Sequence, residues 1–246
     1  MKLEVHALSD RGLVKDKNED IALLGAYLIR DNSWHGKFTE KDLNLFAVAD
    51  GVGGAEGGEI ASEMVVRSLS DFIVSREGEK SAKEKADEIK DWAALMNRMI
   101  VAKAQTTGWK GMGTTLTGLC FEGEHILMFN AGDSRIYRYR DGILRKMTRD
   151  HSLRDLTGNK EVPTNIMYNA FGKREGFFID VEDITTKVRN QDLFLICSDG
   201  LNDMLSDSEI EECLINENSA SLLCEKAKIK GGKDNITYIL LKILSD

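Results

Sequence analysis

The chain has 246 residues, of which 42% are hydrophobic and 30% are charged, so it can bury a substantial core without disulfides or a bilayer. No apolar run is long enough to span a membrane, and the first ten residues lack the basic and apolar segments of a signal peptide. The net charge of −8 argues against a protein that binds nucleic acid or anionic lipid.

The four cysteines form no Cys-x-x-Cys pair and stand mostly in apolar surroundings. They are Cys120, Cys197, Cys213 and Cys224. This pattern is typical of buried thiols in a reducing compartment and argues against metal binding through sulfur. We therefore expect a cytoplasmic protein that forms one domain over residues 1–246.

Apolar and alternating runs predict many strands for one domain. The predicted strands are Lys2–Leu8, Ile21–Leu28, Leu43–Ala49, Thr115–Phe121, His125–Asn130, Ile136–Tyr139, Leu144–Met147, Leu193–Cys197 and Ile236–Ile243. Between two of these strands, Asp141 and Gly142 supply the positive φ angles of a tight hairpin turn. The strands on either side of this turn should therefore pair antiparallel.

Helical periodicity appears in two blocks, Glu59–Ile73 and Ala82–Ala104. Each block carries an apolar stripe, so both helices should rest on a sheet. The first stripe consists of Ile60, Met64, Val65, Leu69, Phe72 and Ile73, and the second of Ile89, Trp92, Leu95, Met96, Met99 and Ile100. We expect both stripes to pack in the core.

Near the end of the chain, Ser206 with Glu209 fits a capping box that begins a short helix through Leu214. Another helix is expected over about 219–230. Antiparallel strands with helices grouped between them predict an α+β fold, with a central antiparallel β-sandwich flanked by helical layers. The stretch from His151 to Gly176 lacks clear periodicity and is the best candidate for a mobile surface segment.

Two apolar runs, "LFAVADG" and "DLFLICSDG", stop abruptly at Asp-Gly, with Asp50 and Asp199 as the acids. A carboxylate at the end of a buried strand is held rigidly at the sheet edge, as a ligand of a hard metal should be. The glycine that follows has no Cβ, so its carbonyl can approach an ion closely. Asp133 in "AGDSR" and Asp234 in "GGKDN" stand in similar settings beside predicted strands.

Further polar residues, Asn18, Glu19 and Asp20, directly precede the strand that begins at Ile21. All these groups are oxygen donors, and no histidine or cysteine is interleaved, which favours Mg²⁺ or Mn²⁺ over Zn²⁺. Two such ions about 3.5 to 4 Å apart can bind a hydroxide between them and stabilise an in-line displacement at phosphorus. The residues therefore predict metal-assisted hydrolysis of a phosphoester.

Six blocks resemble, in order and spacing, the motifs of the metal-dependent serine/threonine protein phosphatases of type 2C. The blocks are "SDRGLVKDKNED", "FAVADGVGG", "GMGTTLTGLC", "FNAGDSRIYRYRDGILRKMTRDHSL", "ICSDGLNDML" and "GGKDNITYILL". The "DHSL" ending and the compact length resemble bacterial members. The resemblance implies the family's β-sandwich and hydrolysis of phosphoserine and phosphothreonine monoesters by a hydroxide that bridges two Mn²⁺ or Mg²⁺ ions. Its partners would be phosphorylated proteins made by an opposing serine/threonine kinase, with no nucleic acid or membrane, and the enzyme would be a monomer.

By this resemblance, Asp50 bridges the two metals, and the carbonyl of Gly51 binds one of them. Asp199 and Asp234 complete the other site, so Asp50 and Asp199 are assigned as catalytic. Asp133 together with Asp199 matches the positions that hold a third, weaker metal in bacterial members.

Other positions match the family only in part. Glu19 and Asp20 match acids that hold metal-bound waters. Lys15 stands where the family has its phosphate-binding arginine; it keeps the charge but loses the bidentate fork, so we assign it to substrate binding with a less directional grip. Val52 stands where animal members carry a histidine proposed to protonate the leaving alkoxide. A metal-bound water is the expected proton donor here, and His151 is the alternative.

The segment Leu153–Gly176 corresponds to the family's flap and is shorter than usual, which puts flap-based substrate selection in doubt. "GMGTT" lacks the lysine of a P-loop, so its glycines should instead allow a strand to pack closely against the site. Asp-Gly is a common turn dipeptide, and only the ordered set with Asp133 and Asp234 makes a simple turn an unsatisfactory interpretation. Two hypotheses stay open beside the protein phosphatase: a non-catalytic relative that binds phosphoproteins or a kinase, with Lys15 marking eroded chemistry, and a small-molecule phosphatase.

Overall fold

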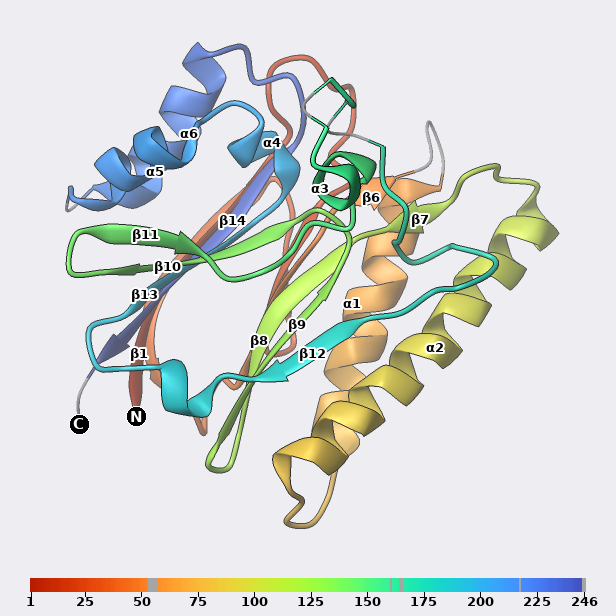
Figure 1. Ribbon diagram of the computed structural model, residues 1–246, viewed down its shortest axis with the longest axis horizontal. Helices are drawn as coiled ribbons and strands as arrows, with labels where there is room; N and C mark the ends of the chain where they lie inside the picture. The colour runs from red at the N-terminus through yellow and green to blue at the C-terminus, as the bar shows by residue number, and fades with distance from the viewer. Residues whose placement is uncertain (53–56, 160, 164–165, 217, 245–246) are drawn as a thin grey trace.

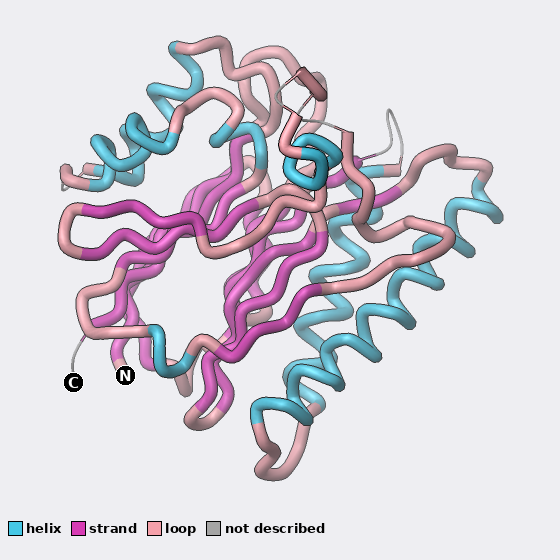
Figure 2. Tube along the Cα trace, in the orientation of Figure 1, coloured by secondary structure: helices cyan, strands magenta, loops and turns pink. Residues whose placement is uncertain are grey.

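The computed structural model of the chain describes residues 1–52, 57–159, 161–163, 166–216 and 218–244. Two six-stranded sheets pack against each other at the centre, and helices cover their outer faces (Figure 1). Figure 2 shows the same arrangement, with strands inside and the longer helices outside. The predicted α+β sandwich between helical layers is confirmed.

Every neighbouring strand pair in the two large sheets is antiparallel. The first sheet has the order β11 (Ile143–Lys146), β10 (Arg135–Arg140), β13 (Leu193–Cys197), β14 (Ile236–Leu244), β1 (Lys2–Asp10) and β4 (Asn32–Thr39). The second sheet has the order β12 (Asp180–Asp183), β9 (His125–Ala131), β8 (Leu116–Glu122), β5 (Leu45–Ala49), β2 (Ile21–Leu24) and β3 (Tyr27–Ile29). Two short strands, β6 (Gly51–Val52) and β7 (Gly113–Thr114), form a separate two-stranded sheet.

The helices form the outer layers. The second sheet is covered by α1 (Gly58–Ser75) and α2 (Ala82–Thr107), and the first by α4 (Asp199–Asn202), α5 (Asp207–Leu214) and α6 (Ser219–Ile229). Two short helices, α3 (Leu153–Thr157) and the 3-10 helix η1 (Thr185–Lys187), lie in connections. Of the helices in the described ranges, none combines the length and the apolar character that crossing a bilayer requires.

Burial along the strands follows these layers. In β1 the residues alternate, because Leu3, Val5 and Ala7 enter the apolar cluster between the sheets while their neighbours face outward. In β5 every residue is buried, since Phe46 enters this same cluster and Ala47 enters the one beneath α1 and α2. A strand with a single covered face thus alternates, and a strand covered on both faces is apolar throughout.

The local signals for turns and caps are confirmed. Asp141 and Gly142 have φ angles of 51° and 82°, and β10 pairs with β11 across them. Ser206 and Glu209 form the predicted capping box, in which each side chain accepts a hydrogen bond from the other residue's backbone N–H. These features depend only on neighbours in the chain, which explains why the sequence reveals them.

The strand predictions need two corrections. The predicted strand Ile21–Leu28 is in fact the hairpin of β2 and β3, because the chain reverses at Gly25, where φ is +59°. A Cβ at Gly25 would also lie 2.6 Å from Cδ1 of Leu43. The strands β4 and β12 were not predicted. Both are edge strands with mostly exposed or partly exposed residues, so neither carries an apolar run.

The predicted core stripes are too wide. On α1, Val65 is fully buried but Ile60 is 36% exposed. On α2, Ile100 is fully buried, whereas Leu95 and Met99 are each about half exposed. A helix that lies on a flat sheet buries only the residues nearest the contact line, so apolar residues at the margin of the stripe stay in solvent.

The sandwich interface should dominate stability, and a matched pair of isoleucines tests this. Ile239 of β14 is fully buried between the sheets, and Ile143 of β11 is 67% exposed. We expect Ile239→Ala to lower the free energy of unfolding by about 2–5 kcal/mol, through lost apolar burial and a cavity. Ile143→Ala should change it by less than about 0.5 kcal/mol. Urea denaturation followed by circular dichroism measures both, and equal losses would contradict this account.

Candidate active site

The two Asp-Gly strand ends lie at the same end of the sandwich. Antiparallel pairing places the end of β5 beside the start of β2, so Asp50 and Asp20 emerge together from the second sheet. The end of β13 lies beside the start of β14, so Asp199 and Asp234 emerge together from the first. Asp133 follows β9, which ends beside the start of β8, and β8 in turn pairs with β5. The carboxyl of Asp50 interacts electrostatically with all four others.

Burial and mutual repulsion raise the pKa of four carboxyls, those of Asp50, Asp20, Asp133 and Asp199. Burial is the main reason that the pKa of Asp50 lies well above its ordinary value, and the neighbouring carboxylates add to it. The same causes, burial first, raise the pKa of Asp20 to about 7, that of Asp133 to about 8 and that of Asp199 to about 6. Asp20 and Asp133 are buried and the other acids are partly buried, so this concentration of negative charge is costly unless cations neutralise it.

The donor set fits hard divalent cations. Each predicted ligand offers a carboxylate or carbonyl oxygen, the ligand type that Mg²⁺ and Mn²⁺ prefer. Among the described residues, the buried Oδ2 atom of Asp20 has no donor at hydrogen-bonding distance. The hydroxyls of Ser198 and Thr237 lie close enough to lower the pKa of Asp20 but leave this oxygen unsatisfied. An orphaned oxygen beside a carboxylate cluster is expected where a cation or its waters bind.

Two threonines hold the backbone of Asp50. Its N–H donates to Oγ1 of Thr115 at 3.0 Å, and its carbonyl accepts from the Thr114 hydroxyl and the Thr115 N–H, both at 2.9 Å. Oγ1 of Thr115 also contacts the Ser134 hydroxyl at 2.7 Å, next to Asp133. The loops that carry Asp50 and Asp133 are therefore linked. Only the glycines of "GMGTT" point to the site in the sequence, so this role of the threonines was not predicted.

The glycines around the site are required by close backbone packing. A Cβ on Gly51 would lie 2.3 Å from the carbonyl oxygen of Gly58, and one on Gly113 would lie 2.4 Å from that of Phe171. A Cβ on Gly200 would lie 1.9 Å from the backbone oxygen of the residue before β14. The predicted close packing of "GMGTT" is found at Gly113, where the close neighbour is the backbone of Phe171, and both Asp-Gly pairs need glycine for the same reason.

Asn235 pins the loop that carries Lys15. Its Oδ1 accepts a hydrogen bond from the Glu19 N–H at 2.9 Å, and its Nδ2 donates to the carbonyls of Arg11 and Lys17, each at 2.9 Å. One amide therefore ties both ends of this loop to the start of β14. Its position directly after Asp234 is the only signal for this role in the sequence.

Lys15 lies at the carboxylate cluster. Its Nζ is 2.7 Å from Oδ1 of Asp234, and both side chains are partly exposed. Partial burial acts to lower the pKa of Lys15, but the hydrogen bond and charge of Asp234 outweigh it, so the net shift is upward. Lys15 is therefore a permanent cation at the rim of the site, paired with a predicted metal ligand.

Glu19 stands between this loop and α1. Burial raises its pKa, while the charge of Lys15 and a hydrogen bond from the backbone of Glu59 oppose the rise. A Cβ on Gly58 would lie 2.6 Å from Oε1 of Glu19, so the carboxyl sits directly against the first turn of α1. The positive end of a helix favours a carboxylate there.

Asp203 is absent from the predicted site, although the structure brings it there. Its N–H donates to the carbonyl of Asp199 at 2.7 Å, and its charge contributes to the raised pKa of both Asp199 and Asp133. The four-residue spacing in "DGLND" is the signal for it, because such spacing returns a side chain to the same side of a helical turn. The adjacent cavity is lined by Asp133, Arg135, Lys146, Asp150, Ser152, Arg154, Asp155, Asp199, Asn202 and Asp203.

His151 is structural. It is almost fully buried, and its Nδ1 accepts from the Gly132 N–H at 3.2 Å and from Nδ2 of Asn169 at 2.8 Å. The amide of Asn169 is oriented by Phe178, whose N–H donates to its Oδ1 and whose carbonyl accepts from its Nδ2. The imidazole proton is therefore on Nε2, which contacts Oδ2 of Asp180 at 2.9 Å. With both nitrogens engaged by these partners, the structure gives no support to His151 as the alternative proton donor.

The predicted flap, Leu153–Gly176, is only partly described, because residues 160, 164 and 165 lie outside the described ranges. It begins with α3, and the Leu153 N–H donates to the carbonyl of Ile166. Phe171 exchanges two backbone hydrogen bonds with Thr114, so the far part of the segment is joined to the site. Its predicted mobility stays a prediction.

Comparison with known proteins gives consistent matches. Residues 27–229 match the family model described as protein phosphatase 2C. The serine/threonine phosphatase Stp of Listeria monocytogenes is 34% identical over 95% of this chain and 93% of its own length. The serine/threonine protein phosphatase PstP of Mycobacterium tuberculosis is 31% identical over 98% of this chain and 45% of its own length.

A solved structure agrees with these relatives. The crystal structure of the catalytic domain of PstP in complex with two manganese ions is 30% identical, with a TM-score of 0.77, over 99% of this chain and all of that one. Similarity of sequence and of fold therefore extends over nearly the whole of this chain. The chain belongs to the protein phosphatase 2C family.

Proposed function

We propose that this chain is a metal-dependent protein serine/threonine phosphatase that hydrolyses phosphoserine and phosphothreonine monoesters with two Mn²⁺ or Mg²⁺ ions. Membership of the protein phosphatase 2C family and the serine/threonine phosphatases among its relatives support this. The two manganese ions in the PstP complex support the metal requirement. The observation that carries the proposal is the convergence of Asp20, Asp50, Asp133, Asp199 and Asp234 at one end of the sandwich.

In this proposal Asp50 would hold both ions, the carbonyl of Gly51 would hold one, and Asp199 and Asp234 would hold the other. When bound, the ions supply an activated water as nucleophile and neutralise charge on the phosphate. Asp133 and Asp199 would hold a third, weaker cation. The hydrogen bonds to the backbone of Asp50 would hold this residue in position without help from the substrate.

The remaining polar groups orient water and substrate. Glu19 and Asp20 would accept hydrogen bonds from waters around the ions. Lys15 would bind the substrate phosphate, because it is protonated, partly exposed and already at the cluster. Lysine acts on a phosphate as a point charge and not as a fork, so its contact can move from Asp234 to the phosphate without a fixed geometry.

We also propose the compartment, the domain organisation and the partners of the enzyme. All four cysteines are unpaired and buried, which supports a reducing, cytoplasmic compartment. Both sheets contribute acids to one site, which supports a single catalytic domain over residues 1–246. Its partners would be phosphoproteins made by an opposing serine/threonine kinase, and we propose that it acts as a monomer.

Asp50→Asn should reduce turnover to the level of the EDTA-treated enzyme, because a neutral amide is a poor ligand for two cations. Hydrolysis of p-nitrophenyl phosphate and of a phosphothreonine peptide with Mn²⁺ measures this. Asp71→Asn, at an exposed position on α1, is the matched control and should be fully active. Unchanged activity of the Asp50 variant would refute the assignment, and preference for sugar phosphates over phosphopeptides would favour a small-molecule phosphatase.

Lys15 can be tested by two substitutions of opposite effect. Lys15→Arg should keep or raise kcat/KM for phosphopeptide, since arginine adds the bidentate fork. Lys15→Met should lower kcat/KM about tenfold or more, because a charged hydrogen bond to phosphate is lost. A large loss in the arginine variant, or none in the methionine variant, would show that the phosphate is gripped elsewhere.

The metal-free protein should lose stability as the pH rises from about 4 toward 8. Its carboxyl pKa values, about 7 for Asp20, 8 for Asp133 and 6 for Asp199, lie above those of an unfolded chain, so the folded state binds protons more tightly and loses that advantage on deprotonation. Cations replace these protons, so Mn²⁺ should raise Tm more at pH 8 than at pH 5.5. Differential scanning fluorimetry with Mn²⁺ or EDTA tests this; a rise that does not change with pH would contradict it.

A further inference from the structure

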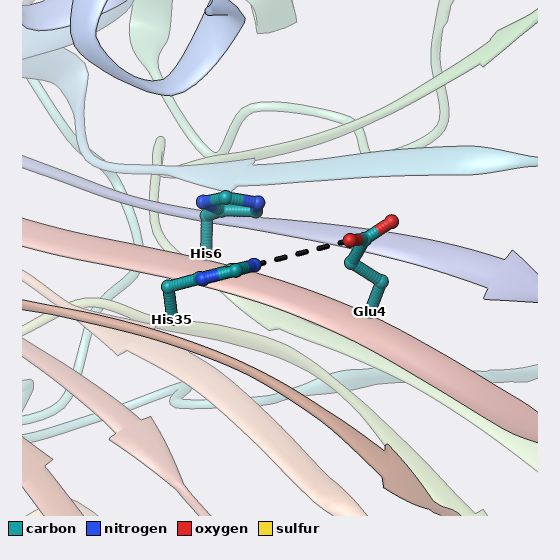
Figure 3. A group of neighbouring side chains, drawn as sticks. All are labelled: Glu4, His6 and His35. Atoms are coloured by element: carbon teal, nitrogen blue, oxygen red, sulfur yellow. Dashed lines mark ion pairs between the residues drawn. The ribbon is translucent and has the colours of Figure 1, made fainter. Parts of the chain in front are cut away.

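Two histidines and one glutamate gather on the outer face of the first sheet, away from the carboxylate cluster. His6 of β1 and His35 of β4 are direct partners in the antiparallel register. Glu4 lies two residues before His6, so its side chain leaves the same face of β1. Figure 3 shows the two stacked rings with the Glu4 carboxylate turned toward His35. Within the described residues this is the only trio of metal-binding side chains whose ligand atoms all lie within 4.8 Å of one another.

We propose that Glu4, His6 and His35 form a second metal site, selective for Zn²⁺ over the Mg²⁺ or Mn²⁺ of the active site. Two imidazoles and one carboxylate form a three-ligand set that Zn²⁺ accepts, with the fourth position left to water. Imidazole ligands favour late first-row metals, whereas the all-oxygen active site favours hard cations. The two sites of this chain would therefore take different metals from one solution.

The strands position the ligands, and small rotations complete the site. The ring centroids of His6 and His35 are 3.9 Å apart with planes 24° from parallel, and Oε1 of Glu4 is 3.8 Å from Nε2 of His35. The lone pairs of imidazole lie in the ring plane, so the rings must turn from stacked to converging for both to bind one ion. This turn uses the soft χ2 torsion and leaves the backbone unchanged. His35 is 56% exposed, so its ring has space to move.

Some neighbouring groups favour metal binding at this site and others oppose it. Burial, followed by the nearby His35, lowers the pKa of His6, which keeps its ring neutral and its lone pair available. Two lysines oppose a cation: Nζ of Lys37 lies 3.4 Å from Oε1 of Glu4, and Lys242 is the partner of Glu4 in β14. Lys37 is mostly exposed, so its ammonium can return to water when Glu4 binds a metal. The affinity should therefore be moderate and sensitive to Lys37.

The bound ion would link an edge strand to the sheet. β4 is the last strand of the first sheet and pairs only with β1 there. One ion held by His6, Glu4 and His35 would join β1 to β4 by side chains in addition to the backbone ladder. Zn²⁺ should therefore stabilise the folded chain, which gives a readout independent of phosphatase activity.

The test is a calorimetric titration of Zn²⁺ into the full chain in the presence of excess Mg²⁺, which occupies the carboxylate cluster. We expect one Zn²⁺ per chain and a rise in Tm, both retained in Asp50→Asn. His35→Gln and His6→Gln should each weaken binding by about tenfold or more, since even residues that only support metal ligands have effects of that size. His125→Gln is the matched control, because this surface histidine of β9 pairs with Asp183 alone among the described groups and should leave binding unchanged.

Two further measurements guard against misfolded variants and non-specific binding. Lys37→Gln keeps all three ligands and should strengthen Zn²⁺ binding several-fold. Co²⁺ used as a probe should give the strong visible absorption of a four-coordinate nitrogen and oxygen site, and this band should vanish in His35→Gln. Equal Zn²⁺ affinity in the native, His6, His35 and His125 proteins, or no binding by the native chain when Mg²⁺ is present, would overturn the proposal.

Discussion

Repulsion between buried and partly buried carboxylates is the constraint on which this structure depends. Asp50, Asp20, Asp133 and Asp199 all have raised pKa values, because burial and like charges disfavour their ionised forms. A flexible chain would separate these groups. The sandwich prevents this, because each acid is attached to a strand end whose position is set by the backbone ladder and the apolar core between the sheets. The hydrogen bonds and apolar packing of the sandwich thus hold the acids together in a site that strongly attracts cations.

The supporting groups act mainly through the backbone. Thr114 and Thr115 hold both polar backbone groups of Asp50, and Asn235 holds the loop of Lys15 by three hydrogen bonds. The carboxylate oxygens therefore stay available for cations. On the outer face of the first sheet the same principle places His6 opposite His35, where cross-strand register assembles nitrogen donors. One scaffold thus presents two donor sets of different chemical hardness.

Much of the fold and the acids of the site could be predicted from the sequence, because their signals are local. An apolar run that ends in Asp-Gly marks a buried strand with a carboxylate at its end, whatever lies beside it. The capping box at Ser206 and the hairpin turn at Asp141 are likewise set by residues close in the chain. The exposure of Leu95 and Met99, at the margin of the apolar stripe of α2, could not be predicted. Helical spacing identifies the apolar side of a helix but not how much of that side the sheet covers.

By itself, then, the sequence determined which residues end strands, cap helices and offer oxygen to a cation. Only the tertiary structure decided who their neighbours are: Lys15 pairs with Asp234, Asp203 joins the acids, and both ring nitrogens of His151 are engaged by distant groups. The polar edge strands β4 and β12 were also revealed only by the tertiary structure, since each forms only against a partner strand. The physical reason is that strand register and loop packing join segments far apart in the chain, and such contacts leave no periodic trace in the sequence.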